Sequence, residues 1–205
     1  TYTWGPAGPV LTAGRARNMV VDMNNANLLY VGSSSSGVFR STNGGALWTP
    51  VNDQDPVRNI SYMAQSVDGT VYAATGEGFL RIGQRALARP GTGLYKLVGN
   101  QLVLVTDSST TGSVIHRIAC HPSDAQKIAL ATNKGVMISH DAGKTFNLIA
   151  VTPSSVQVKD RSYGMDVKFD ANGLLYCTIG NERGGLVQPV NYSNYHSMVF
   201  KSDDA

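Results

Sequence analysis

The chain has 205 residues, of which 15% are charged and 22 are glycine, with a net charge of +3. This length allows one sizeable core, and the low charge with abundant glycine favours short strands joined by tight turns over long helices. The basic residues are dispersed, which argues against a nucleic-acid partner, and no run of 18 apolar residues predicts a membrane-spanning helix.

Four consecutive segments share one pattern of strands and turns. Each opens with an alternating apolar strand that ends near Asp22, Val67, Pro122 or Asp170. After a polar turn, a second strand is centred on Tyr30, Tyr72, Ala129 or Tyr176. The third strand reads GVFRS, GLYKL, GVMIS or MVFKS, and a fourth strand carries Trp48, Val103 or Phe146 in the first three segments. The chain is therefore built from an internal repeat of four short strands.

Four strands per unit of about 40–45 residues are typical of a propeller blade. One such sheet cannot bury both of its faces alone, whereas neighbouring blades stacked around an axis cover each other. We therefore predict an all-β fold, a β-propeller of about four four-stranded antiparallel blades, forming one domain over 1–205. The blades are expected at roughly 1–55, 56–107, 108–152 and 153–205, and a β-sandwich is the competing fold.

The hairpin between the third and fourth strands carries a recurring octapeptide. It reads SHDAGKTF over 139–146 and STNGGALW over 41–48, starts again at 202–205, and is lost at 97–100. Glycine suits the positive φ of a tight turn, and Asp or Asn can accept hydrogen bonds from backbone amides across it. The aromatic residue at the end is expected to pack under the hairpin.

This octapeptide resembles the Asp-box, or BNR repeat, of bacterial sialidases, xyloglucanases, sortilin-type receptors and secreted bacterial surface proteins. The resemblance implies a propeller in which the box is a structural turn away from the ligand face. The residues assigned to that structural role are Ser41, Asn43, Gly45, Trp48, Ser139, Asp141, Gly143 and Phe146. It also implies a secreted or cell-surface protein, with attachment through regions outside this sequence.

The two ends of the sequence leave two arrangements open. The opening TYTWGPAGP is similar to the fourth strand of a blade, and the fourth segment lacks a fourth strand of its own. Residues 1–4 could therefore complete a ring of four blades. We instead expect further blades after Ala205, because the sequence ends inside a motif rather than at a domain edge.

The catalytic residues of the similar enzymes are not recognisable. The sialidase motif Phe/Tyr-Arg-Ile-Pro is missing from the sequence, and Ser34 stands where xyloglucanases carry a catalytic Asp. A serine cannot serve as the carboxylic acid of glycoside hydrolysis. Glu77 and Glu182 follow the second strands of their segments at equivalent places and are the remaining candidates for acid/base catalysis. The alternative for both is a turn-capping glutamate or one paired with Arg81 or Arg183.

Two long insertions, FLRIGQRALARP and RGGLVQPVNYSNYHS, follow these glutamates. Long insertions on one face of a repeat protein often bind ligands, so we predict contacts to a carbohydrate or a protein. The expected binding residues are Arg81, Arg85, Arg183, Tyr192 and Tyr195. The four histidines are scattered, and we expect neither a metal site nor a cofactor.

The two cysteines, Cys120 and Cys177, each lie in an apolar strand pattern. Their spacing fits no metal motif. Free buried thiols and a disulfide between them both remain open, with free thiols favoured.

The leading functional hypothesis is a non-catalytic binding, scaffold or adhesion module of a secreted or cell-surface protein. The first alternative is a glycoside hydrolase of xyloglucanase type that uses paired carboxylates, so the sequence leaves enzymatic activity undecided. The second alternative is a peptide-binding receptor domain of sortilin type.

Overall fold

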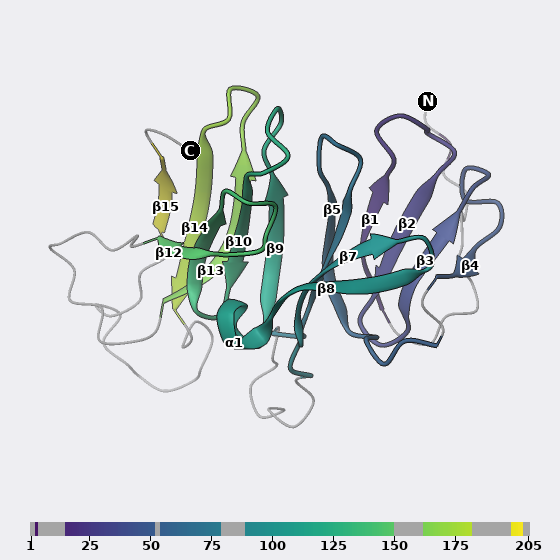
Figure 1. The fold of residues 1–205 in the computed structure, drawn as a ribbon, viewed down its shortest axis with the longest axis horizontal. Helices are drawn as coiled ribbons and strands as arrows, with labels where there is room; N and C mark the ends of the chain where they lie inside the picture. Colours follow the sequence, from purple (N-terminus) through teal and green to yellow (C-terminus); the bar gives the residue numbers. More distant parts are fainter. Residues whose placement is uncertain are drawn as a thin grey trace, which may run out of the picture.

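The computed structural model describes residues 3, 15–51, 54–78, 89–149, 162–181 and 198–202. Its regular structure is almost entirely β, in four small antiparallel sheets (Figure 1). The first sheet contains β1 (Ala16–Val21), β2 (Leu29–Ser33), β3 (Gly37–Ser41) and β4 (Thr49–Pro50). The second contains β5 (Ile60–Gln65), β6 (Val71–Thr75), β7 (Gly93–Val98) and β8 (Gln101–Asp107).

A four-residue helix, α1 (Ser108–Thr111), connects the second sheet to the third. The third sheet contains β9 (Ile115–Cys120), β10 (Ile128–Thr132), β11 (Gly135–Ser139) and β12 (Asn147–Ile149). The fourth contains β13 (Ser162–Phe169), β14 (Leu175–Asn181) and β15 (Met198–Lys201) among the described residues. In every sheet the strands follow one another in chain order, as in a meander.

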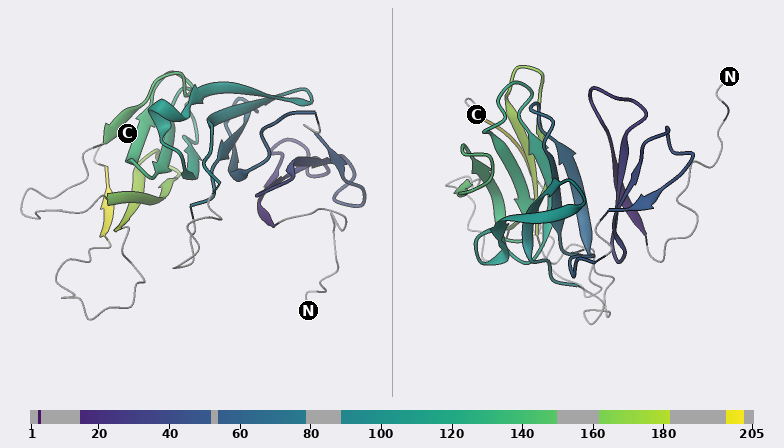
Figure 2. Two further views of the ribbon diagram at one scale, coloured as in Figure 1. Left: turned by 90° about the horizontal axis from the view of Figure 1, so that it is seen from below. Right: turned by 45° about the vertical axis from the view of Figure 1, so that its right-hand side comes forward.

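The four sheets are the blades of a β-propeller, which confirms the predicted fold. Neighbouring blades pack through their first strands, since β5 contacts both β1 and β9, and β9 contacts β13. Figures 1 and 2 show the blades side by side along an arc, with the first and fourth blades at its two ends. The first strand of each blade is therefore the inner strand, next to the axis.

The hydrophobic core is divided into three layers, one between each pair of neighbouring blades. In β10, Ile128 and Leu130 face the second blade, whereas Ala129 and Ala131 face the fourth. Because side chains alternate along a strand, one strand supplies two cores. All four residues are fully buried. This explains why the second strands read as continuous apolar runs rather than as alternating patterns.

Every inner strand carries a β-bulge at the same place. The pairing of the first and second strands skips one residue in each blade. The unpaired residues are Arg17, Ser61, His116 and Met165. A bulge re-aims the side chain of its extra residue, and bulges often lie beside functional sites.

An aspartate organises the turn between the first and second strands of each blade. Its carboxylate accepts a hydrogen bond from the backbone N–H two residues ahead, at 2.9–3.0 Å. These residues are Asp22, Asp68, Asp124 and Asp170. Such Asx turns are local, which is why the repeated turn chemistry is visible in the sequence.

The turn over 139–146 is held by its own side chains. Ser139 Oγ accepts from the backbone N–H of Gly143 at 2.8 Å and donates to Asp141 at 2.8 Å. Asp141 in turn accepts from the backbone N–H and the hydroxyl of Thr145 at 2.9 and 2.6 Å. Gly143 has a φ of 85°, in the left-handed region that favours glycine.

The turn over 41–48 repeats this geometry with Asn43 in place of aspartate. Ser41 Oγ accepts from Gly45 N–H at 2.9 Å, and Asn43 Oδ1 accepts from Leu47 N–H at 2.8 Å. The prediction that Trp48 and Phe146 belong to the fourth strands is wrong, because each residue directly precedes β4 or β12. Trp48 and Phe146 are the last residues of these turns, so each fourth strand begins one residue later. Phe146 packs against the core between the second and third blades.

The Asp141 turn should make folding stability depend on pH. Hydrogen bonds from Thr145, followed by that from Ser139, lower the pKa of Asp141 from 3.8 to about 2. A carboxylate with a depressed pKa stabilises the fold above its unfolded pKa and loses this effect as the pH falls through the folded value. We expect Asp141→Asn to lower the unfolding temperature at pH 7, with the difference disappearing as the pH falls from about 4 to about 2.

Circular dichroism melting of both proteins across this range checks the expectation. Asn43→Ala is the matched control, because an amide does not titrate and its loss should lower the melting temperature equally at pH 2 and pH 7. A difference between the Asp141→Asn variant and the unmodified protein that stays constant with pH would contradict the prediction.

Candidate functional site

The candidate site lies at the end of the strands opposite the turns over 41–48 and 139–146. In the first blade Ser33 pairs with both Ala16 and Gly37, whereas Leu29 pairs with Ser41 at the other end. The start of each inner strand and the exit of each second strand therefore share one end of the propeller. This is the end near α1 in Figure 1.

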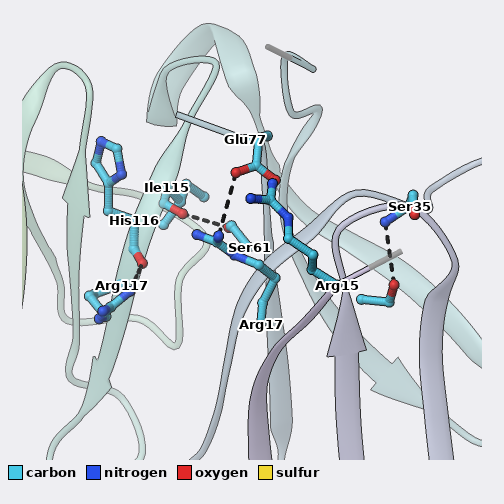
Figure 3. A network of polar contacts seen from close by, with 9 residues as sticks. Arg15, Arg17, Ser35, Ser61, Glu77, Ile115, His116 and Arg117 are labelled. Carbon is cyan, nitrogen blue, oxygen red and sulfur yellow. Dashed lines mark hydrogen bonds and ion pairs between the residues drawn. The ribbon is translucent and has the colours of Figure 1, made fainter. Parts of the chain in front are cut away.

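Glu77, a predicted catalytic candidate, is partly buried and lies between two arginines at this end (Figure 3). Its Oε2 lies 2.9 Å from Nη2 of Arg15, and its Oε1 lies 3.4 Å from Nη1 of Arg17. The Glu77 side chain is 11% exposed. Oε1 accepts no hydrogen bond despite the ion pair, so its interaction with Arg17 is electrostatic. The Glu77 carboxylate thus forms ion pairs with two guanidinium groups.

The alternative of an arginine-paired glutamate therefore describes Glu77, but the partners differ from those expected. Arg15 and Arg17 come from the inner strand of the first blade and the residue before it, some 60 positions earlier in the sequence. Arg81 and Arg183, the predicted partners, lie outside the described residues. The remaining predicted site residues, Glu182, Arg85, Tyr192 and Tyr195, lie outside them as well, so their roles stay predictions.

Two glycines allow the backbone around Glu77 to pass close to the third blade. A Cβ on Gly76, whose φ is 107°, would lie 2.4 Å from the carbonyl oxygen of Ser113. A Cβ on Gly78 would lie 2.6 Å from Cε1 of His116. The Glu77 N–H donates to the carbonyl of Arg89 at 2.8 Å. The backbone of Gly76-Glu77-Gly78 therefore passes close to the third blade, and this contact fixes the position of the Glu77 carboxylate.

Polar contacts connect the inner strands at the same level. Ser61, an unpaired bulge residue, donates from its hydroxyl to the carbonyl of Ile115 at 2.6 Å. Asn18, next to the bulge of the first blade, donates to the carbonyl of Met63 at 2.7 Å. Each bond joins the inner strands of two neighbouring blades through a side chain and a backbone carbonyl.

His116, the bulge residue of the third blade, is buried. Burial, reinforced by the charges of Arg117 and Arg17, lowers the pKa of His116 from 6.5 to about 4. The imidazole is therefore neutral at physiological pH, and the arginines carry the positive charge of this region.

Arg117 is held from several sides. Its Cζ lies 4.8 Å from the centroid of the Tyr62 ring, and its Nε lies 3.6 Å from Oδ1 of Asp166. Its Nη1 also donates to the carbonyl of His116 at 2.9 Å. Tyr62, Arg117 and Asp166 each directly follow the bulge residue of their own inner strand. The propeller thus places equivalent residues of three blades in one row.

Sequence reasoning missed Ser61, His116, Arg117 and Asp166, and it counted Arg15 and Arg17 among the dispersed basic residues. The signal that could have found them is their shared place in the repeat, within two residues of the bulge in each inner strand. The bulge that re-aims them depends on the pairing of two strands and has no local sequence pattern.

The other candidate features of the sequence are a metal site, the two cysteines and Ser34. Within the described residues, no three histidine, cysteine, aspartate or glutamate side chains gather as a metal site. Cys120 and Cys177 are free thiols, and burial raises the pKa of Cys120 to about 12, which leaves its thiol protonated and unreactive. Ser34 donates its backbone N–H to the carbonyl of Arg15 and lies in the turn between β2 and β3. No helix of the described part could span a membrane.

Comparison with solved structures finds other propellers. An ancestral GH74 enzyme superposes with a TM-score of 0.65 at 22% identity, over 92% of this chain and 24% of that one. A GH74 xyloglucanase from Xanthomonas campestris gives 0.58 at 16% identity, over 91% and 29%. An auxiliary nutrient binding protein from Bacteroides ovatus gives 0.52 at 11% identity, over 82% and 40%.

These likenesses establish the fold. The chain spans about a quarter of the length of the GH74 structures it matches. No protein-family model matches it, and no curated protein is similar enough to match.

Proposed function

We propose that the chain is part of a non-catalytic, carbohydrate-binding propeller of a secreted or cell-surface protein. The observation that carries the proposal is the state of Glu77, whose two carboxylate oxygens face Arg15 and Arg17. A general acid or base needs a carboxyl oxygen that faces the substrate, whereas both oxygens of Glu77 face arginines of the first blade. We infer that Glu77 positions these arginines rather than acting on a substrate.

We also infer that the turns over 41–48 and 139–146 are Asp-box turns. Their side-chain hydrogen bonds close on the turn itself, and they lie at the opposite end of the strands from Glu77. Both features support a purely structural role for Ser41, Asn43, Ser139 and Asp141. The resemblance of these turns to those of secreted bacterial surface proteins supports a location outside the cell.

A glycoside hydrolase is the second candidate, favoured by the likeness to the GH74 structures. Against it stands the arginine pairing of Glu77, together with the serine at position 34 where the similar xyloglucanases carry an aspartate. A retaining or inverting hydrolase needs two carboxyl groups flanking the scissile bond, one of which must be protonated.

The two candidates are separated by assaying binding and hydrolysis on the same panel of polysaccharides, xyloglucan included. We expect retardation of the protein in affinity electrophoresis by at least one polysaccharide, with no release of reducing sugar. Glu77→Gln breaks both ion pairs and should weaken binding and stability together. The matched control is Asp124→Asn, at the opposite end of the strands.

Release of reducing sugar from xyloglucan that is abolished by Glu77→Gln and kept by Asp124→Asn would establish the hydrolase instead. Binding to peptides on an array, without binding to any polysaccharide, would favour the receptor of sortilin type.

A further inference from the structure

Arg117 differs from the other charged groups of the candidate site in having a guanidinium that is both fixed and partly open. The side chain is 34% exposed, whereas that of Arg17 is 16% exposed and is turned to Glu77. The Arg117 guanidinium lies over the Tyr62 ring, faces Asp166 through Nε and donates to the His116 carbonyl through Nη1. Within the described part of the chain, Nη2 of Arg117 donates no hydrogen bond.

A guanidinium held in this way is prepared for a planar anionic group. Arginine donors form a rigid fork that matches the two oxygens of a carboxylate, and preorganisation lowers the entropy lost on binding. The 3.6 Å separation from Asp166 is longer than a hydrogen bond, and Asp166 Oδ1 also accepts from the Val167 N–H at 3.0 Å. Asp166 is therefore an ion-pair partner that orients Arg117, and it engages the Nε side of the guanidinium.

The charge around Arg117 also favours an anion. Arg15 and Arg17 both face the carboxylate of Glu77 at this end of the propeller. Arg15 is 66% exposed, so its positive charge faces solvent. The neighbouring His116 is neutral at pH 7, and its ring is buried and does not compete for the ligand.

Resting on the proposed carbohydrate-binding function, we propose that Arg117 is the ligand-contacting residue of this end of the propeller and that it binds the carboxylate of a uronic acid in an acidic polysaccharide. Tyr62 and Asp166 act as positioning residues that hold the guanidinium from the neighbouring blades. The row formed by Tyr62, Arg117 and Asp166 would then run beneath the bound sugar.

The experiment compares oligogalacturonate, which carries a carboxylate on every sugar, with neutral xyloglucan oligosaccharides in calorimetric titrations of the full chain. We expect oligogalacturonate to bind more tightly than the neutral sugars and to weaken as NaCl is raised, because the contact is ionic. Arg117→Gln should reduce the affinity at least tenfold. Arg117→Lys keeps the positive charge but loses the forked pair of donors. Its affinity for oligogalacturonate should lie between those of the unmodified protein and Arg117→Gln.

Lys144→Gln is the matched control, because it removes one positive charge from an exposed side chain at the opposite end of the strands. It should leave oligogalacturonate binding unchanged. Circular dichroism spectra of every variant show whether the fold is kept. If Arg117→Gln unfolds, the oligogalacturonate affinity of Arg117→Lys still tests the role of Arg117.

Three results would overturn the proposal. Binding of neutral sugars without binding of oligogalacturonate would show that the site does not recognise a carboxylate. Unchanged affinity in folded Arg117→Gln and Arg117→Lys would remove Arg117 from the site. Equal binding of poly-glutamate would make an acidic protein the ligand. The proposed function fails separately, when no sugar of either kind binds.

Discussion

Replacing Gly76 with alanine is expected to destabilise the protein by more than about 4 kcal/mol, a loss large enough to unfold many domains of this size. The glycine has a φ of 107°, which an L side chain rarely adopts. The added Cβ would lie 2.4 Å from the Ser113 carbonyl oxygen and 2.8 Å from Val114 Cα. Both atoms belong to the backbone, so neither can move aside by a change of rotamer.

Urea unfolding measures this loss, and Gly69→Ala is its matched control. Gly69 has a φ of 89°, but a Cβ there would meet no atom within 4 Å. Its substitution should cost only the left-handed backbone penalty of about 1–2 kcal/mol. Equal losses at the two positions would mean that the second and third blades are not packed as closely at Gly76 as the structure shows.

The second large effect is a loss of stability in mild acid, caused by His116. Burial first, and then the charges of Arg117 and Arg17, lower the pKa of His116 from 6.5 to about 4. In the unfolded chain the imidazole is protonated below about pH 6.5, whereas the folded protein takes up this proton only near pH 4. The unfolded state therefore binds more protons between these values, and stability falls as the pH drops from about 6.5 to about 4.

The shift corresponds to about 3 kcal/mol over that window, at 1.36 kcal/mol for each pKa unit. Urea unfolding at a series of pH values from 4 to 8 should show this slope, and His116→Gln should lack most of it. His140 lies exposed in the turn over 139–146, so His140→Asn is expected to keep the slope of the unmodified protein. A His116→Gln variant with an unchanged slope would show that other groups cause the acid sensitivity.

The sequence by itself determined the repeat and the turns, because both depend on residues that lie close together in the chain. Alternation of apolar residues predicts strands, and an Asp or Asn two residues before a free N–H predicts a turn wherever it occurs. Asp68 and Asp141, for example, make hydrogen bonds only within four residues of themselves. Stacked sheets then follow from the repeat, since a single small sheet leaves its apolar faces uncovered.

Only the tertiary structure decided which charges meet. The β-bulges at Arg17, Ser61 and His116 arise from the pairing of two strands, and no residue type signals them in the sequence. The partners of Glu77 were predicted among nearby arginines, but the carboxylate faces the first blade. Arg117 likewise meets residues of two other blades, about 50 positions away on either side. Contacts of this kind depend on how blades pack around the axis, where separation along the chain no longer limits which side chains are neighbours.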